Sequence, residues 1–291
     1  MSVPAAFAHQ IARARELLSP CRLCPRQCGV KRLEGETGFC GIGATAVVSS
    51  AGPHFGEESC LVGGGGSGTI FLAGCNLGCV FCQNYDISHH ARGRPQPPEV
   101  IAETMMALAE LGCENINFVT PTHVAPQLMA AIDLARQGGL TQPIVWNCGG
   151  YESLEALQQL EGLVDIYMPD FKYAGGEPAR RFSAAEDYPQ VIHVALKEMQ
   201  RQVGDLVLVD GVARRGLLVR HLVLPNGLAG SNDAIDFLAD EVSPNTYVNV
   251  MGQYRPEFRA REHSELCRRP TPDEIAEARH YAHFRGLRLA D

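Results

Sequence analysis

The feature that most constrains the fold is a short apolar segment that leads directly into three closely spaced cysteines. Residues 69–73 read Thr-Ile-Phe-Leu-Ala, a β-branched and aromatic run that predicts a buried strand. Gly74 follows, and glycine permits the tight turn that we expect here. Cys75, Cys79 and Cys82 then have the spacing C-x3-C-x2-C, which can turn three thiolates toward one centre. The sequence therefore predicts a metal centre at the carboxyl end of a strand, where α/β folds place their sites.

Three close thiolates with no obvious local fourth ligand indicate a particular kind of metal centre. A cubane iron–sulfur cluster is usually held by four protein thiolates, so three would leave one iron open to bind another molecule. The alternative is that these cysteines are free or bind zinc. Structural zinc sites usually take four ligands with paired spacings, and no partner pair lies within this loop. We therefore predict a cluster with one open iron.

Strand and helix patterns alternate along the chain. Including the first strand, we expect strands over residues 69–73, 115–119, 144–148, 164–168, 217–224 and 247–251. Between and after them we expect helices over about 97–112, 124–137, 153–161, 188–202, 231–241 and 271–284. Strands that alternate with helices of this kind predict a parallel sheet. Six such units predict an α/β fold, a partial (β/α)6 barrel that stays open along one side.

A second group of cysteines lies near the start of the chain. Cys21, Cys24 and Cys28 follow one another closely, and Cys40 comes after an eleven-residue loop. Four cysteines in so short a segment predict a compact four-thiolate site, with unligated structural cysteines as the alternative. Four thiolates suit either zinc or an auxiliary iron–sulfur cluster, and the residues do not decide between them. Because the protein would take every position, we expect no catalytic role for this metal.

These patterns divide the chain into two parts. Residues 1–62 would form an N-terminal module with an amphipathic helix over 4–18, the four cysteines, and a β-hairpin over 44–62 that turns at 51–53. Residues 63–291 would form the partial barrel and a C-terminal helix. A chain of 291 residues is long enough for one such barrel and a small appendage.

Composition and charge exclude several classes of protein. With 25 basic and 33 acidic residues the formal charge is −8, and without a basic run we expect no nucleic-acid partner. No apolar stretch approaches the ~20 residues that a membrane span needs, and the first residues lack a signal-peptide pattern. We therefore expect a cytoplasmic protein, whose thiols stay reduced. Eleven cysteines in that compartment indicate metal binding or redox chemistry.

Several short motifs together resemble one known family. They are Cys-Arg-Leu-Cys-Pro-Arg-Gln-Cys at 21–28, Gly-Ser-Gly-Thr-Ile-Phe-Leu-Ala-Gly-Cys-Asn-Leu-Gly-Cys-Val-Phe-Cys-Gln-Asn at 66–84, Val-Thr-Pro-Thr-His at 119–123, Asn-Cys-Gly-Gly-Tyr at 147–151, Tyr-Met-Pro-Asp-Phe-Lys-Tyr at 167–173, and Arg-His-Leu-Val-Leu-Pro-Asn-Gly at 220–227. The chain resembles the radical S-adenosylmethionine (SAM) superfamily. Within it, the chain is similar to homologues of pyruvate formate-lyase activating enzyme that carry an N-terminal cysteine module.

The resemblance implies a cofactor pair and its first ligands. Cys75, Cys79 and Cys82 would bind a [4Fe-4S] cluster, and the amino and carboxylate groups of SAM would chelate its open iron. Phe81 would pack near the adenine of SAM. The backbone around Asn84 would lie beside that adenine.

The strand ends supply the other SAM contacts that the resemblance implies. Asp170 and Lys172 match an Asp-x-Lys motif of the family and could hold the ribose hydroxyls and the methionine carboxylate. Many family members have Gly-Gly-Glu at the end of the second strand, where it meets the SAM amino group. Here that region reads Thr-Pro-Thr-His, and we take Thr120 as the partner. Further candidates at comparable strand ends, with ordinary structural contacts as the alternative, are Asn147, Arg220 and Gln253.

The reaction that the resemblance implies is reductive cleavage of SAM to methionine and a 5′-deoxyadenosyl radical, which takes hydrogen from a substrate. The electron would come from a donor such as flavodoxin or ferredoxin. The substrate stays open between a glycine on a protein partner, as in glycyl-radical enzyme activation, and a peptide or small metabolite. A hypothesis of another class is a non-catalytic iron–sulfur electron carrier or metal-binding protein. Phe81 and the Asp170–Lys172 pair argue against it, because an electron carrier needs no nucleotide pocket.

Overall fold

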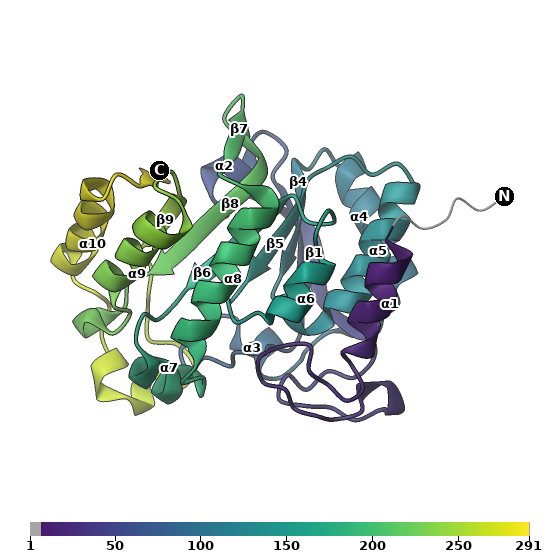
Figure 1. Ribbon diagram of the computed structural model, residues 1–291, viewed down its shortest axis with the longest axis horizontal. Coiled ribbons are helices and arrows are strands. Elements are labelled where there is room, and N and C mark those ends of the chain that lie inside the picture. The colour runs from purple at the N-terminus through teal and green to yellow at the C-terminus, as the bar shows by residue number, and fades with distance from the viewer. Residues whose placement is uncertain (1–6, 291) are drawn as a thin grey trace.

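A mixed sheet forms the centre of the computed structural model, which describes residues 7–290 (Figure 1). Its strands follow the order β10-β9-β8-β6-β5-β4-β2-β1-β3, and β7 pairs with β8. The parallel strands of the described residues are β2 (Ser67–Leu72), β4 (Asn115–Val119), β5 (Ile144–Cys148), β6 (Ile166–Phe171), β8 (Val212–Leu222), β9 (Tyr247–Met251) and β10 (Arg288–Leu289). The antiparallel strands are β1 (Ala46–His54), β3 (Arg94–Gln96) and β7 (Val207–Val209).

Helices follow the parallel strands in turn. They are α4 (Pro98–Glu110), α5 (Ala125–Gln137), α6 (Leu154–Gln159), α8 (Tyr188–Val203), α9 (Ser231–Phe237) and α10 (Pro272–Phe284). Figure 1 shows them along one face of the sheet, from α10 at the left to α4 at the right. The remaining α-helices among residues 7–290 are α1 (Ala8–Glu16), α2 (Ser59–Val62), α3 (Tyr85–Ser88) and α7 (Gly176–Ser183). The predicted α/β sheet is confirmed, and it brings the carboxyl ends of its parallel strands to one edge.

The predicted strand over 164–168 begins and ends later than expected. β6 continues through Pro169 to Phe171. Proline has no N–H to donate and is tolerated where a ladder is interrupted, and the pairing of β6 with β8 skips residues 168 and 169. Asp170 therefore lies within a strand rather than in the following loop. By contrast, β4, β5 and β9 have the predicted bounds.

The hairpin predicted over residues 44–62 does not form. β1 runs without a turn through Ala51, Gly52 and Pro53 and pairs with β2. Pro53 is accommodated because β3 pairs only with residues 46–48, so one edge of β1 is unpaired at the proline. β1 is therefore part of the central sheet.

The predicted N-terminal helix is shorter than expected, and six α-helices and strands of the described residues were not predicted, among them the four-residue helices α2 and α3. The helix over 4–18 is observed as α1, and residues 4–6 lie outside the described part of the chain. The strands β3, β7 and β10 are two or three residues long, too short for a periodic pattern. The helix α7 starts at Gly176 and contains Pro178, residue types that indicate a turn.

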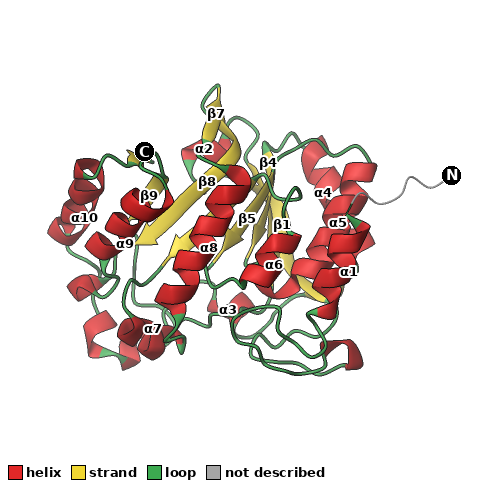
Figure 2. Ribbon diagram, in the orientation of Figure 1, coloured by secondary structure: helices red, strands yellow, loops and turns green. Residues whose placement is uncertain are grey.

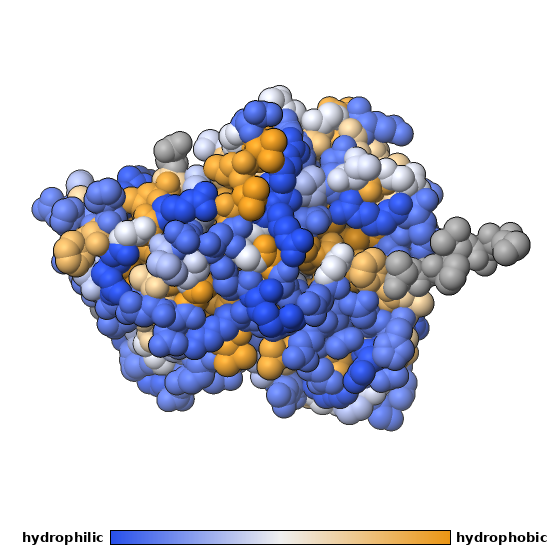
Figure 3. Space-filling model, turned by 45° about the horizontal axis from the view of Figure 1, so that its top comes forward, coloured by the Kyte–Doolittle hydropathy of each residue, from blue (hydrophilic) through white to orange (hydrophobic). Residues whose placement is uncertain are grey.

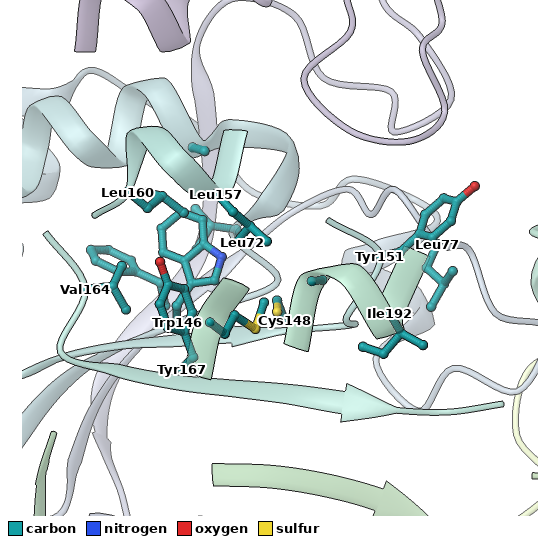
Figure 4. Close-up of a cluster of buried hydrophobic side chains, with 14 of the residues drawn as sticks. Leu72, Leu77, Trp146, Cys148, Tyr151, Leu157, Leu160, Val164, Tyr167 and Ile192 are labelled. Carbon is teal, nitrogen blue, oxygen red and sulfur yellow. The ribbon is translucent and has the colours of Figure 1, made fainter. Parts of the chain in front are cut away.

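The apolar core reaches from the helices to the cysteine loop. Trp146 of β5 is fully buried, and Figure 4 shows its ring beside Leu157 and Leu160. Leu77 of the cysteine loop is buried too, and a Cβ on Gly149 would lie 3.3 Å from its Cδ2. The loop is therefore packed against the end of β5, which limits its freedom to move.

The surface view in Figure 3 shows hydrophilic side chains over most of one face, with smaller apolar areas between them. Large exposed apolar side chains such as Phe55, Leu111 and Phe284 belong to separate elements. Among residues 7–290, no helix combines the length and the apolar character needed to cross a membrane.

Candidate active site

A cavity of about 260 Å³ lies at the carboxyl ends of the parallel strands. The three cysteines after β2 and all the residues predicted to contact SAM line it. Along the chain these residues are Cys75, Cys79, Phe81, Cys82, Asn84, Thr120, Asn147, Asp170, Lys172, Arg220 and Gln253. They come from the ends of β2, β4, β5, β6, β8 and β9. Their shared location is observed, whereas their roles as ligands stay predictions.

The turn predicted at Gly74 is confirmed. Its φ of +82° is left-handed, a conformation that glycine adopts readily. A Cβ at this position would lie 2.6 Å from the carbonyl oxygen of Cys40. Gly74 therefore lets the cysteine loop pass against the N-terminal segment, a contact that any larger residue would block.

Each thiol of the cysteine loop has a hydrogen-bond donor nearby. Ser183, at the end of α7, donates from Oγ to Cys79 Sγ at 3.1 Å. Ser88 of α3 donates from Oγ to Cys82 Sγ at 3.1 Å. A backbone N–H within the loop donates to Cys75 Sγ at 3.3 Å. Donors of this kind favour the thiolate form, which is the form that binds metal.

Burial is the main influence on these thiols. It raises the pKa of Cys75 to about 12, and it also raises the pKa of Cys79, although the Lys172 ammonium opposes that rise. A buried thiol becomes a thiolate when a metal replaces its proton. Within residues 7–290, no group of three or more cysteine, histidine or acidic side chains is placed around a single metal ion. In a cubane each thiolate binds its own iron, so three thiols that line one cavity fit that ligand set.

Three charged side chains that line the same cavity form a compact network. Lys172 Nζ donates to Asp170 Oδ2 at 2.6 Å, and Arg220 Nε donates to Asp170 Oδ1 at 2.7 Å. Burial works against the Asp170 carboxylate, but the two cations outweigh it and lower the pKa of Asp170. In return, Asp170 raises the pKa of both cations despite their burial. All three groups are therefore charged at neutral pH.

The network continues on both sides of Arg220. Its Nη2 donates to Asn147 Oδ1 at 2.6 Å, which joins the ends of β5 and β8. Its Nη1 lies 3.6 Å from Glu57 Oε2, just before α2. Burial raises the pKa of Glu57, although Arg220 opposes the rise. Arg220 thus faces two carboxylates and one amide, and its side chain is only 17% exposed.

The other predicted contacts surround this network. Phe81 is buried, and its ring centroid lies 5.7 Å from that of Tyr254 in an edge-to-face arrangement. Thr120 has a φ of +61°, an uncommon conformation for a β-branched residue, and its N–H donates to the Asn147 carbonyl at 2.8 Å. Backbone strain of this kind is often found at functional sites. Gln253 Nε2 donates to Met251 Sδ at 3.1 Å.

The N-terminal cysteines line a second, much smaller space. Cys21, Cys24, Cys28 and Cys40 surround a cavity of about 10 Å³. Figure 2 shows that the chain there is mostly loop between α1 and β1. Burial raises the pKa of Cys24 to about 12 and also raises that of Cys40, which Arg32 opposes. The four cysteines therefore line one cavity beside the cysteine loop, but among the described residues they are not arranged around a single ion.

Sequence reasoning missed the residues whose hydroxyls donate hydrogen bonds to the thiols and backbone carbonyls of the site. Ser183 and Ser88 were not singled out, and Tyr188 OH donates to the carbonyl oxygens of Gly149 and Asp170 at 3.0 and 2.6 Å. Ser88, six residues after Cys82, is the one that proximity in sequence could have indicated. Ser183 and Tyr188 reach the site through α7 and α8, and no sequence pattern marks that approach.

Comparisons with known proteins agree with this arrangement. The model of the radical SAM superfamily matches residues 69–182, which include the three cysteines of the loop. An uncharacterized protein of Methanocaldococcus jannaschii, MJ0674, is 34% identical over 288 residues, which cover 95% of this chain and 78% of that protein. A second uncharacterized protein of the same organism, MJ0808, is 26% identical over 303 residues, with 92% and 79% covered.

Among solved structures, QueE from Escherichia coli aligns over 90% of this chain and 97% of its own, with a TM-score of 0.44 and 13% identity. The radical SAM superfamily implies a [4Fe-4S] cluster and SAM as cofactors. The chain belongs to the radical SAM superfamily and is one of its enzymes.

Proposed function

We propose that this enzyme binds a [4Fe-4S] cluster through Cys75, Cys79 and Cys82 and cleaves SAM reductively in the cavity beside them. One observation carries the proposal: the three thiols and the charged network of Asp170, Lys172 and Arg220 face the same cavity. When bound, SAM and the reduced cluster supply a 5′-deoxyadenosyl radical, which takes a hydrogen atom from the substrate.

The charged network would orient SAM. Lys172 and Arg220 would present cationic groups to the methionine carboxylate of SAM. Asp170 would accept hydrogen bonds from the ribose hydroxyls of SAM. Because Asp170 already joins both cations, the three side chains are held in place before SAM arrives.

The apolar residues of the cavity would exclude water and seat the adenine. Phe81 is held edge-on by Tyr254 and Tyr173, at centroid distances of 5.7 and 6.2 Å. The backbone around Asn84 starts α3 beside it. Thr120 would meet the SAM amino group, with Asn147 and Gln253 as further polar contacts. A dry, pre-shaped site of this kind restricts a radical to one C–H bond.

For the substrate we propose a glycine on a protein partner, as in pyruvate formate-lyase activating enzyme. In this reading the fold is a partial (β/α)6 barrel that does not close. Its end strands β10 and β3 have no pairing with each other, and an open side supports entry of a protein loop. We also propose that the enzyme works in the reducing cytoplasm. Its electron would come from a donor such as flavodoxin or ferredoxin.

We extend the proposal to the N-terminal cysteines as an auxiliary metal site, either zinc or a second cluster. Four thiols that line one small cavity support it, although among the described residues they are not arranged around a single ion. Metal analysis of protein that lacks the cysteines of the main loop would distinguish the two metals. Neither zinc nor iron in that protein would contradict this part of the proposal.

The main test is anaerobic reconstitution with iron, sulfide, dithionite and SAM. The expected product is 5′-deoxyadenosine, absent from a Cys75→Ala variant and formed normally by Cys267→Ala, whose thiol is exposed and is not among the residues that line the cavity. Equal product from both variants would contradict the assigned ligands. A glycyl-radical signal on a candidate partner after incubation would support the protein substrate, and product without any such signal would favour a peptide or small metabolite.

A further inference from the structure

Arg26 lies between Cys24 and Cys28, yet its side chain reaches the cysteine loop. Its Nε donates to the carbonyl oxygen of Asn76 at 2.8 Å, and its Nη2 donates to that of Leu77 at 3.0 Å. Both acceptors lie between Cys75 and Cys79 in the loop. The guanidinium therefore satisfies two successive carbonyls of the segment that joins two of the proposed cluster ligands.

The same guanidinium also holds the end of α7. Nη2 donates to the carbonyl of Ser183 at 2.7 Å, and Nη1 donates to that of Ala184. Ser183 in turn donates from its Oγ to Cys79 Sγ. Arg26 thus fastens the loop and the donor of one of its thiols to each other.

Close packing around Arg26 limits where its side chain can go. Its guanidinium lies 3.9 Å from the ring centroid of Phe39. A Cβ on Gly78 would lie 2.9 Å from the same ring, so the loop itself presses against Phe39. Asn76 is 2% exposed and donates from Nδ2 to the carbonyl of Tyr151 at 2.7 Å. The N-terminal segment and the loop are therefore one packed unit.

We propose that Arg26 is a positioning residue that fixes the cysteine loop from the N-terminal module. The inference rests on the proposed function, because it assigns that loop to the cluster. Arginine suits the task because its planar fork directs donors from separate nitrogens at carbonyls of two segments, whereas all the donors of a lysine lie on one nitrogen. Removing it leaves four backbone carbonyls without this partner, and partly buried acceptors without partners are costly. The loop would then sample other conformations.

Hydrogen–deuterium exchange of the full chain tests this, before and after anaerobic reconstitution. In Arg26→Gln we expect the peptide over 74–84 to exchange about tenfold faster before reconstitution. Arg22→Gln is the matched control, since Arg22 lies in the same segment and its guanidinium forms an ion pair with the exposed Glu155. Its exchange should equal that of the unaltered chain.

Two outcomes would overturn the inference. One is unchanged exchange in Arg26→Gln. The other is faster exchange throughout the chain both in Arg26→Gln and in Arg26→Lys, which keeps the charge. A change that is not confined to 74–84 and the end of α7 would exclude a local role.

After reconstitution, the electron paramagnetic resonance spectrum of the reduced cluster gives a second readout. Arg26→Gln should retain iron but broaden the spectrum and weaken its response to SAM, whereas Arg22→Gln should not. An unaltered chain that takes up no cluster would contradict the proposed function. The exchange result would still decide whether Arg26 holds the loop.

Discussion

The two cysteine sets differ in what lies in front of their thiols. Cys75, Cys79 and Cys82 open onto a cavity of about 260 Å³ that also holds charged side chains. The N-terminal set lines only about 10 Å³, beside the apolar Leu23 and Phe39 and the cationic Arg26 and Arg32. Two sets of thiols can therefore have different functions, because the space in front of them decides whether a bound metal can also bind another molecule. We expect chemistry at the first set and structural support at the second.

The largest effect on SAM cleavage should come from removing one cysteine from each set in separate variants. Cys79→Ala removes a proposed cluster ligand that is buried and hydrogen-bonded to Ser183, so SAM cleavage should fall to background. Cys24→Ala should retain a measurable part of it. The measurement is 5′-deoxyadenosine formed per chain under reducing conditions. If the two variants lost cleavage equally, the distinction between the sets would be wrong.

The next largest effect should follow from Asp170→Asn. The substitution leaves Lys172 and Arg220 facing each other without their shared carboxylate. Removing one member of a buried ion-pair network costs about 3 kcal/mol, and SAM binding should weaken by about a hundredfold. Calorimetric titration with SAM and thermal unfolding measure the two consequences.

Asp165→Asn is the control for that substitution. Asp165 precedes the same strand at its other end and pairs with Arg136 at 2.9 Å, with both side chains about one-third exposed. A partly exposed pair of this kind contributes about 1 kcal/mol or less. SAM binding should be unchanged, and a comparable loss in both variants would mean that Asp170 acts only through overall stability.

Much of this contrast was predictable from the sequence, and the part that was not has physical causes. The motif after β2 and the strand-end residues Asp170 and Lys172 mark the site, because parallel strands bring their ends to one edge. Arg26 and Ser183 reach the site through tertiary packing between segments far apart in the chain. A spacing pattern contains no record of such contacts. The turn predicted at 51–53 was wrong because an unpaired strand edge accepts proline.

A smaller effect on catalysis is expected from the N-terminal set. Cys24→Ser and Cys28→Ser should each release the proposed auxiliary metal, and the chain should lose about 2 kcal/mol of unfolding free energy, or about 5 °C in Tm. SAM cleavage should fall only several-fold, because the loop loses support while its thiols remain. Cys113→Ser, at a buried thiol outside both cavities, is the control. If Cys24→Ser and Cys28→Ser both kept the metal content of the unaltered chain, the proposed auxiliary metal site would be wrong.

The smallest effect on catalysis concerns Glu152, which lies between the two regions. Its side chain is buried and accepts a hydrogen bond from Thr122 Oγ1, and next to Thr122 the carbonyl of His123 accepts from Arg32 of the N-terminal segment. Burial raises the pKa of Glu152 from 4.5 to about 7. Between these values the folded chain binds more protons than the unfolded chain, so stability falls as pH rises.

Glu152→Gln tests this dependence, because glutamine stays neutral at every pH. The unaltered chain should lose about 2 kcal/mol relative to the variant between pH 5 and pH 8, as measured by chemical unfolding at several pH values. SAM cleavage at neutral pH should be the same in both, since Glu152 is not among the residues that line the active-site cavity. Parallel stability curves for the two proteins would show that Glu152 is already ionised at pH 5. The surroundings of Glu152 would then be more polar than the burial of its side chain implies.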